Sequence, residues 1–280
     1  EHTAGYGPWA QQRGKGQARR TEFGTIYSET VWGMRAAFYH AHFLPWLGYF
    51  SKIEYSDLLV VLDKALFRRN YIKRVKILGT DGEPEWLTLP VGNNWAIPSD
   101  EITLPQDIDY RAKILRTIEL SYRRASSFAA EIETVRSIFL SAYRPGSNLV
   151  QANVQAIVEL RKAWTDRPTN IVYASTFSLS KDRNVRMVEI CKQLGVTEIL
   201  AGDGKMMAVH DIEYITANGI KFVRQPFKES HPIYPQHHRV QRGLPFVPGL
   251  SILDAFLNVG RESMMALLKS PALEPVRWDD

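Results

Sequence analysis

Short apolar runs alternate with helix-like segments along the chain, and this alternation restricts the possible folds more than any other feature of the sequence. The strand-like runs are DLLVVLD (57–63), NIVYAST (170–176), TEILAG (197–202) and IKFVRQP (220–226). Apolar runs of this length are typical of strands that are buried on both faces. Because strands joined through helices pair in parallel, the pattern predicts an α/β fold with a doubly wound, mainly parallel, Rossmann-like sheet.

The segments between these runs predict a β-hairpin and a helical insertion. RAAFYHAH (35–42) is expected to be a first strand, and a short helix should follow in 45–56. The runs 71–78 and 85–91 flank the turn GTDGEP and predict the hairpin. Apolar residues at three- and four-residue spacing predict the helical insertion over 113–166.

Glycines and one serine mark the ends of further helices. Helices over 181–195 and 211–219 are each expected to end at their last residue, a glycine. The segment FVPGLSILDAFLNVG (246–260) predicts a closing helix that begins after Ser251 as its N-cap and ends at Gly260.

Composition and the first residues of the chain define the expected domain organisation. The 280 residues are 45% hydrophobic and 23% charged, as in an ordinary globular protein. Residues 1–32 are rich in Gly and Arg and lack apolar periodicity, so we expect a basic extended arm before a single α/β domain over 33–280. The one cysteine, Cys191, excludes a disulfide framework and should pack on the apolar face of a helix. No apolar run approaches the roughly 18 residues of a membrane span, and no signal peptide is evident, so we expect a cytoplasmic protein without a membrane partner.

Polar residues that follow the predicted strands define the candidate site. Ligands of open parallel sheets bind beyond the carboxyl ends of the strands, at the point where the strand order switches. The residues selected in this way are His40, His42, Asp63, Lys64, Ser175, Thr176, Ser178, Gly202, Asp203, Gly204 and Lys205.

The two histidines have three interpretations. HAH places both imidazoles on one side of an extended strand, which suits a metal, but no companion ligands with metal spacing are apparent, and we predict no metal site. Imidazoles beside a helix N-terminus could instead face the anionic group of a nucleotide. In the third interpretation, one of the two histidines is packed in the core.

Other charged segments have both a binding and a solvent interpretation. RRNYIKR (68–74) brings Arg69 and Arg74 near the predicted cleft, as a phosphate or carboxylate clamp or as a solvated face. AGDGKM (201–206) is either an anion cradle or a tight turn, and it lacks the spacing of a P-loop. On the closing helix, Asp254 and Asn258 lie one turn apart and share a face. They are either polar positions on a helix that docks onto the domain or part of one wall of the site.

Four segments carry a resemblance to a known family. FLPWLGYFSKIEYSDLLVVLD, WLTLPV, YPQ and FVPGLSILDAFLNVG occur in this order and resemble the WbqC-like protein family, over about Met34 to Leu268. Members occur in bacterial O-antigen and other surface or specialised biosynthesis clusters. The resemblance implies a glycyl or other aminoacyl transferase that acts on an amino-sugar-type acceptor. It also adds Gln236, in YPQ, to the predicted substrate-binding residues.

Several polar positions depart from the family pattern. The first strand of the family commonly ends in HQPxYLPW, whereas Tyr39, His40 and Ala41 stand in place of His, Gln and Pro. In the family segment LDDxQF, Asp63 is kept and Lys64 replaces the second acidic residue. The apolar positions of the family pattern are therefore kept, while several polar positions of the cleft differ. This implies either altered substrate choice or loss of the ancestral reaction.

These observations lead to one main functional hypothesis and two alternatives. In the main hypothesis the chain transfers an activated acyl group, with His40 stabilising negative charge, Asp63 acting on the acceptor amine, and Arg74 holding an anion. No cofactor is certain; a nucleotide or an activated acyl donor is the candidate, and a small molecule is the expected partner. The alternatives are a non-catalytic sugar- or nucleotide-binding protein and a nucleic-acid-binding protein that uses RGKGQARR. The sequence leaves the oligomeric state open. The main hypothesis predicts that Asp63, Arg74 and Asp254 converge on one pocket.

Overall fold

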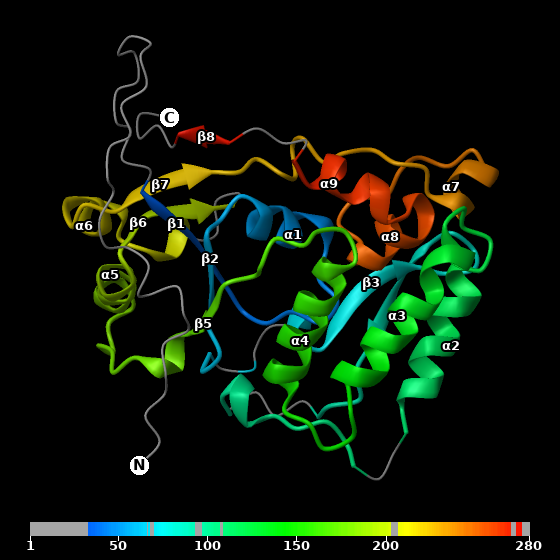
Figure 1. Cartoon of the computed structure of the whole chain (residues 1–280), viewed down its shortest axis with the longest axis horizontal. Coiled ribbons are helices and arrows are strands. Elements are labelled where there is room, and N and C mark those ends of the chain that lie inside the picture. Colours follow the sequence, from blue (N-terminus) through cyan, green and yellow to red (C-terminus); the bar gives the residue numbers. More distant parts are fainter. Residues whose placement is uncertain are drawn as a thin grey trace, which may run out of the picture. The chain divides into compact units, whose positions relative to one another are not determined.

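A six-stranded sheet with the strand order β5-β2-β1-β6-β7-β8 forms the centre of the fold (Figure 1). Strands β1, β2, β5, β6 and β7 run parallel, and β8 pairs antiparallel with β7. This arrangement confirms the predicted doubly wound, mainly parallel sheet. The strands are β1 (Met34–Tyr39), β2 (Leu58–Val61), β5 (Ile171–Tyr173), β6 (Val196–Ala201), β7 (Lys221–Arg224) and β8 (Glu274–Pro275).

The structure is a computed structural model that describes residues 33–65, 67, 70–92, 97–106, 109–202, 207–269 and 273–275. The expected arm over 1–32 lies outside the described residues. So do four of the predicted site residues, Arg69, Asp203, Gly204 and Lys205.

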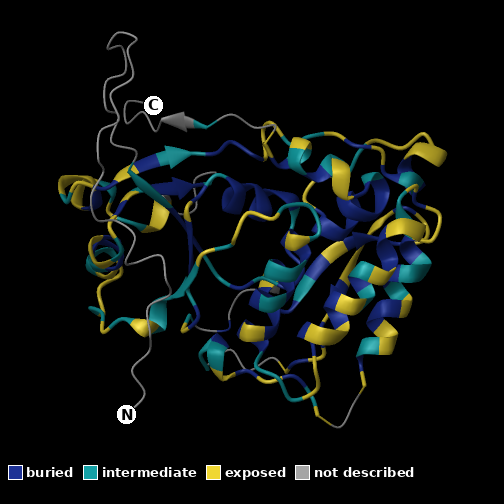
Figure 2. Ribbon diagram, viewed as in Figure 1, coloured by how far each residue is buried: buried dark blue, intermediate teal, exposed yellow. Residues whose placement is uncertain are grey.

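Both faces of the sheet are covered, because its central strands direct alternate side chains to two separate apolar clusters. In β2, Leu59 and Val61 belong to one cluster, and Leu58 and Val60 belong to the other. The continuous apolar run is therefore explained by burial on both faces. In Figure 2 the central strands are mainly in the colour of buried residues, and all four residues of β2 are buried.

Helices cover the two faces unequally. On one face, α5 (Arg183–Leu194) and α6 (Ile212–Ala217) supply the packing. Cys191 of α5 is buried there, and burial raises the pKa of its thiol to about 12, so the predicted packing role is confirmed. On the other face the sheet packs into a larger apolar cluster, to which the following helices contribute: α1 (Leu47–Glu54), α2 (Arg111–Tyr122), α3 (Phe128–Ala142), α4 (Leu149–Lys162), α8 (Ile252–Val259) and α9 (Arg261–Lys269).

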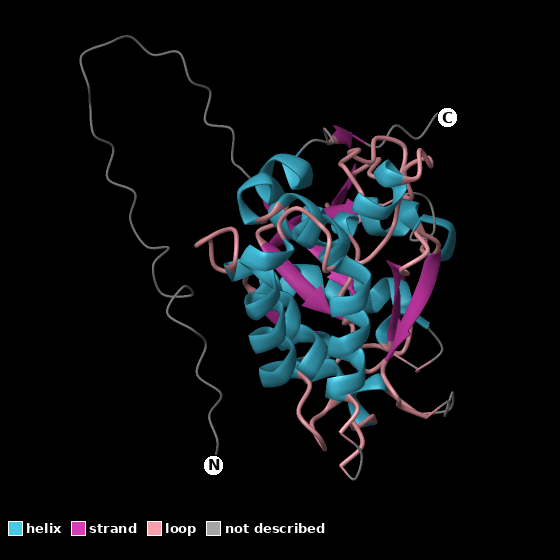
Figure 3. Cartoon of the chain, turned by 90° about the vertical axis from the view of Figure 1, so that its right-hand side faces the viewer, coloured by secondary structure: helices cyan, strands magenta, loops and turns pink. Residues whose placement is uncertain are grey.

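The predicted hairpin forms a separate two-stranded antiparallel sheet, β3 (Arg74–Leu78) and β4 (Pro84–Thr88), apart from the main sheet (Figure 3). Lys76 lies directly opposite Trp86 in its register. The hairpin strands and α2, α3 and α4 therefore occupy the segments from which the sequence predicted the hairpin and the helical insertion.

The predicted helix boundaries are confirmed at Gly195, Ser251 and Gly260, whereas the helix expected to end at Gly219 ends at Ala217. Two helices were not predicted. Gly195 ends α5 with a φ of 69°, which favours glycine, and the Ser251 hydroxyl accepts a hydrogen bond from the Leu253 N–H at the start of α8 (3.3 Å). The short α7 (His237–Gln241) and α9 were not predicted.

The first strand is shorter than predicted. It ends at Tyr39, opposite Val61, the last residue of β2. With no neighbouring strand to pair with beyond that point, His40 and the residues after it form a loop.

Candidate functional site

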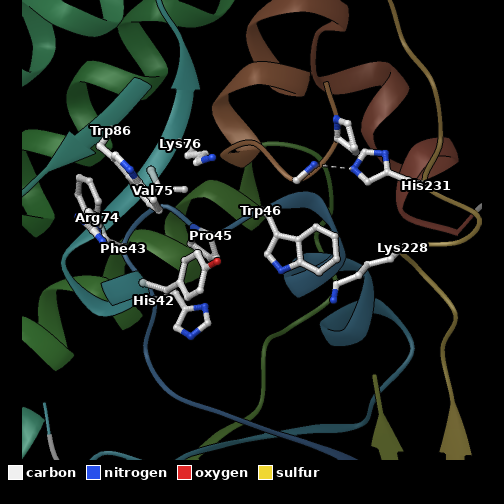
Figure 4. Close-up of a pocket in the computed structure, with 13 residues that line it drawn as sticks. His42, Phe43, Pro45, Trp46, Arg74, Val75, Lys76, Trp86, Lys228 and His231 are labelled. Atoms are coloured by element: carbon white, nitrogen blue, oxygen red, sulfur yellow. Dashed lines mark hydrogen bonds between the residues drawn. The ribbon is translucent and has the colours of Figure 1, made fainter. Parts of the chain in front are cut away.

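A cavity of about 480 Å³ opens between the loop after β1, the hairpin, and the loop segments 228–231 and 248–249 (Figure 4). We call it the aromatic cavity. Aromatic rings and three cations line it, and none of its described lining residues is Asp or Glu. Its lining residues are His42, Phe43, Pro45, Trp46, Tyr71, Arg74, Val75, Lys76, Trp86, Lys228, His231, Pro248 and Gly249.

The loop after β1 makes a sharp turn before it enters α1. Leu44 has a φ of 38°, in the left-handed region that non-glycine residues rarely occupy. The Trp46 indole then lies against Gly48, where any side-chain carbon would come within 2.5 Å of the ring. A glycine at position 48 is therefore what allows Trp46 to form part of the cavity wall.

The start of α8 ties three walls of the cavity together. Ser251 donates its N–H to the Lys76 carbonyl of the hairpin (2.8 Å) and its hydroxyl to the Leu44 carbonyl (2.8 Å). The Ile252 N–H donates to the Pro45 carbonyl (2.8 Å). The closing segment thus holds the hairpin and the loop after β1 in register with each other.

Cations on the hairpin lie over an aromatic ring. The Arg74 guanidinium carbon is 4.2 Å from the centre of the Trp86 ring, and the Lys76 ammonium is 5.5 Å from it. Within the described part of the chain, Arg74 forms no ion pair, and its buried Nε has no hydrogen-bond partner. Stacking fixes the plane of the guanidinium and leaves it able to bind an anion.

The rings of the hairpin wall are exposed enough to meet a ligand. Tyr71 is 55% exposed and Trp86 is 41% exposed. The His42 ring lies 5.6 Å from the Tyr71 ring, and Tyr39 and Tyr49 continue the series of neighbouring rings toward β1. An aromatic surface with cations beside it suits a ligand that combines a ring with an anionic group.

His231 is held by the backbone. Its Nδ1 lies 2.9 Å from the Pro232 carbonyl oxygen, and its Nε2 accepts a hydrogen bond from the Gly249 N–H (3.3 Å; Figure 4). Burial lowers the pKa of its imidazole. A neutral ring with both nitrogens engaged builds the cavity wall and is poorly suited to act as a base.

A second cavity, of about 350 Å³, lies at the carboxyl ends of β1, β2 and β5. We call it the strand-end cavity. It brings together the predicted residues His40, Lys64 and Ser175, in agreement with the strand-end rule. The full lining is His40, Leu62, Lys64, Ala65, Ala174, Ser175, Phe177, Leu179, Ser180 and Arg186.

Asp63 lies in the chain between Leu62 and Lys64, two lining residues of this second cavity. Its buried carboxylate accepts a hydrogen bond from the Ser175 N–H (3.1 Å), which joins the ends of β2 and β5. The Nδ1 of His40 lies 3.2 Å from the Leu62 carbonyl oxygen.

The two histidines do not face the same space, which corrects the sequence expectation. His40 lines the strand-end cavity and His42 lines the aromatic cavity. The residue between them is fixed by Asn153 of α4, whose amide donates to the Ala41 carbonyl (2.9 Å) and to the Ile72 carbonyl (2.8 Å). The helical insertion therefore positions the loop that separates the two cavities.

The expectation that Asp63, Arg74 and Asp254 converge on one pocket is wrong. Arg74 lines the aromatic cavity, whereas Asp63 and Asp254 are buried and line neither cavity. The closing helix α8 is buried from Ile252 to Asn258, and Asp254 faces the interior, where it contacts Tyr234 and Gln236.

Gln236, Asp254 and Asn258 form a buried network that supports the cavity wall. Asp254 Oδ2 accepts hydrogen bonds from the Tyr234 hydroxyl (2.8 Å) and from Gln236 Nε2 (2.9 Å). Gln236 also pairs with both backbone groups of Val247, the residue before the lining residue Pro248. Asn258 donates to the Asp254 carbonyl (2.7 Å) and accepts from the His237 N–H (2.9 Å). These contacts position the 247–249 segment.

Burial raises the pKa of Asp254 to about 6, although the hydrogen bonds from Tyr234 and Gln236 act in the opposite direction. The unfolded-state pKa is about 3.9, so the folded protein holds this proton more tightly. The Asp254 contribution to the free energy of unfolding should therefore fall by about 2 kcal/mol as pH rises from 4.5 to 7.5. We expect the Asp254→Asn variant to lack this pH-dependent part of the free energy of unfolding. Urea unfolding of parent and variant at both pH values measures it as the change in their difference. A constant difference would contradict the raised pKa.

Gly202, at the end of β6, is close to a buried lysine. A side-chain carbon on Gly202 would meet the Lys52 Nζ at 2.7 Å. Lys52 also lies 5.0 Å from the Tyr39 ring centre, at the β1/β6 boundary where the strand order switches. Among the described residues, no group of three or more His, Cys, Asp and Glu could hold a metal ion. In the same part of the chain, no helix has the length and apolar character needed to span a membrane.

Several lining residues of the aromatic cavity were not predicted as site residues. Trp46 and Trp86 lie inside the family-like segments FLPWLGYF and WLTLPV, so the resemblance was a usable signal for them. Tyr71, Lys76 and Lys228 carry no distinguishing local pattern.

Comparison with known proteins agrees with the resemblance. Residues 40–266 match the WbqC-like protein family. A curated relative, "Uncharacterized protein Rv1507c" of Mycobacterium tuberculosis (strain ATCC 25618 / H37Rv), is 22% identical over 231 residues, which cover 82% of this chain and 95% of the relative. No solved structure gives a significant match. The family match covers most of the chain, including the loop after β1, the hairpin and the closing helix, and the protein therefore belongs to the WbqC-like family.

Proposed function

We propose that the protein is a group-transfer enzyme that forms an amide or ester from an activated carboxylate, and that an anionic, ring-bearing substrate binds in the aromatic cavity. The observation that carries the proposal is the described lining of this cavity, which has Arg74, Lys76 and Lys228 among aromatic rings and contains no Asp or Glu. Cations bind phosphate or carboxylate, and ring faces bind a sugar or a base. The volume is in the range of small-molecule sites. A nucleotide-linked amino sugar combines these features.

Amide formation needs a base for the acceptor amine. In the proposed step the acceptor nitrogen attacks the acyl carbon and a C–N bond forms. The bond from the acyl carbon to the leaving oxygen breaks, the amine proton passes to the base, and the leaving group departs as an anion. We assign Asp63 as the base and His40 to the stabilisation of negative charge. His40 is supported by its place in the lining of the strand-end cavity, and Asp63 by its place in the chain between the lining residues Leu62 and Lys64.

Binding of uridine diphosphate, with uridine as the uncharged control, tests the substrate class. We expect calorimetry to give at least tenfold tighter binding of the diphosphate, and an affinity that falls with added salt. Equal affinities for the two compounds, or binding of neither, would contradict the assignment. Mass spectrometry of small molecules retained by the purified protein would then identify the substrate, and Asp63→Asn should keep its affinity while product formation falls.

A non-catalytic binding protein is the second candidate function. It is favoured by the absence of Asp and Glu from the described lining of the aromatic cavity and by the engagement of both His231 nitrogens. That cavity alone could bind a ligand without a base to act on it. Product formation by the parent protein with the retained small molecule separates the two functions.

A further inference from the structure

The strand-end cavity has the chemistry of an anion site with an apolar side. Two cations, Lys64 and Arg186, and the imidazole of His40 line it together with two serines. Within the described residues, neither Lys64 nor Arg186 forms an ion pair. The rest of the lining is mainly apolar and comprises Leu62, Ala65, Ala174, Phe177 and Leu179.

Two carboxylates near this cavity accept hydrogen bonds from backbone N–H groups. Asp63 accepts from the Ser175 N–H (3.1 Å), and Glu189 accepts from the Ser180 N–H (2.8 Å). Neither lines the cavity. Asp182, one turn before Arg186, interacts with it electrostatically, but its carboxylate accepts from the Asn184 and Val185 N–H groups and forms no ion pair with Arg186 in the described part of the chain. Lys64 and Arg186 can therefore still form charge-assisted hydrogen bonds with an anion.

The two cavities are adjacent along the chain but have separate linings. They share no lining residue, and His40 and His42 belong to one each. Because His40 and His42 are two residues apart in sequence, their Cα atoms can be at most about 7 Å from each other. Asn153 holds the loop between the two cavities, and one imidazole lies on each side of that loop. Two substrates that react with each other must bind at neighbouring positions, and this arrangement provides them.

We propose that the strand-end cavity is a second binding site, which takes a small organic anion with a short apolar tail while the aromatic cavity holds its own ligand. The anionic group is a carboxylate or a phosphate and is held by Lys64 and Arg186. The tail lies against Leu62, Phe177 and Leu179. The role of this anion as the activated acyl donor rests on the proposed function, whereas its binding does not.

Propylphosphonate is a stable probe of this site, and inorganic phosphate is the control without a tail. In calorimetry the parent protein should bind one propylphosphonate, about tenfold more tightly than phosphate, because the propyl group leaves water. The double variant Lys64→Glu/Arg186→Glu should lose at least thirtyfold in propylphosphonate affinity. Lys192→Glu, on the same helix as Arg186 but in neither cavity, should bind it like the parent.

Competition tests whether the sites are separate. With propylphosphonate at saturation, the apparent Kd of uridine diphosphate should change less than threefold. A Kd that rises in proportion to the propylphosphonate concentration would show one shared site and overturn the proposal. Absence of propylphosphonate binding, or equal binding by the double variant, would also overturn it. If propylphosphonate binds as expected and uridine diphosphate does not, the proposed function fails while the second site stands.

Discussion

Arg161→Met is expected to lower the free energy of unfolding by about 3–5 kcal/mol, because it leaves a buried carboxylate without its partner. Arg161 of α4 donates Nε and Nη2 to the two carboxylate oxygens of Glu54 in α1, at 2.7 and 3.0 Å. Their side chains are 2% and 0% exposed. Arg161 also donates to the Arg167 carbonyl and to the Thr169 hydroxyl (3.0 Å). Urea unfolding at pH 7 measures the loss.

A second ion pair of the same length provides the control. Arg136 Nη2 lies 2.7 Å from Glu119 Oε1, but these side chains are 41% and 23% exposed. Arg136→Met should therefore cost less than about 1 kcal/mol. The double variant Arg161→Met/Glu54→Leu should recover much of the stability, since no unpaired charge then remains. Similar losses from Arg161→Met and Arg136→Met would show that burial does not decide the strength of the α1–α4 pair.

Arg74→Glu is expected to weaken uridine diphosphate binding at least 100-fold with little change in melting temperature. The substitution removes a charge-assisted donor and places a carboxylate beside the anion. Arg74 is half-buried against Trp86 at the cavity wall, outside the apolar core, so the fold should tolerate the change. Arg74→Lys should lose about tenfold, because an ammonium keeps the charge but not the planar, stacked fork.

Arg116→Glu makes the same change of charge at a site remote from the cavities. Arg116 lies on α2, its side chain is 68% exposed, and it lines neither the aromatic nor the strand-end cavity. We expect its uridine diphosphate affinity to match that of the parent within threefold. An equal loss in Arg116→Glu and Arg74→Glu would indicate a general effect of net charge, and retained binding in Arg74→Glu would remove Arg74 from the site.

Part of the candidate site follows from the sequence because it depends on strand ends. His40, Lys64 and Ser175 each lie at or just beyond the carboxyl end of a predicted strand, and the carboxyl ends of parallel strands meet at one edge of a sheet. The aromatic cavity does not follow from that rule. Lys228 and Trp86 reach it from segments far apart in the sequence, and no local pattern states that these segments meet.

Polar residues on the closing segment also show that local sequence does not determine which distant segments they contact. Asp254 and Asn258 were correctly placed on one face of a helix, and their hydrogen bond joins successive turns. The spacing could not tell whether that face meets a ligand or the interior. The Tyr234 and Gln236 side chains settle this by donating to Asp254 from another segment.

The sequence by itself determined the parallel sheet, the hairpin, the ends of α5 and α8, and the position of Cys191 in the core. These features depend on the periodicity of apolar residues and on helix capping, both of which can be read directly from the order of residues. Tertiary structure decided that β1 ends at Tyr39, that His40 and His42 face different cavities, and that Arg74 is separated from Asp63 and Asp254. Periodicity records which side of an element is buried, whereas a site depends on which distant elements pack together, and that is fixed only by the packing of the whole fold.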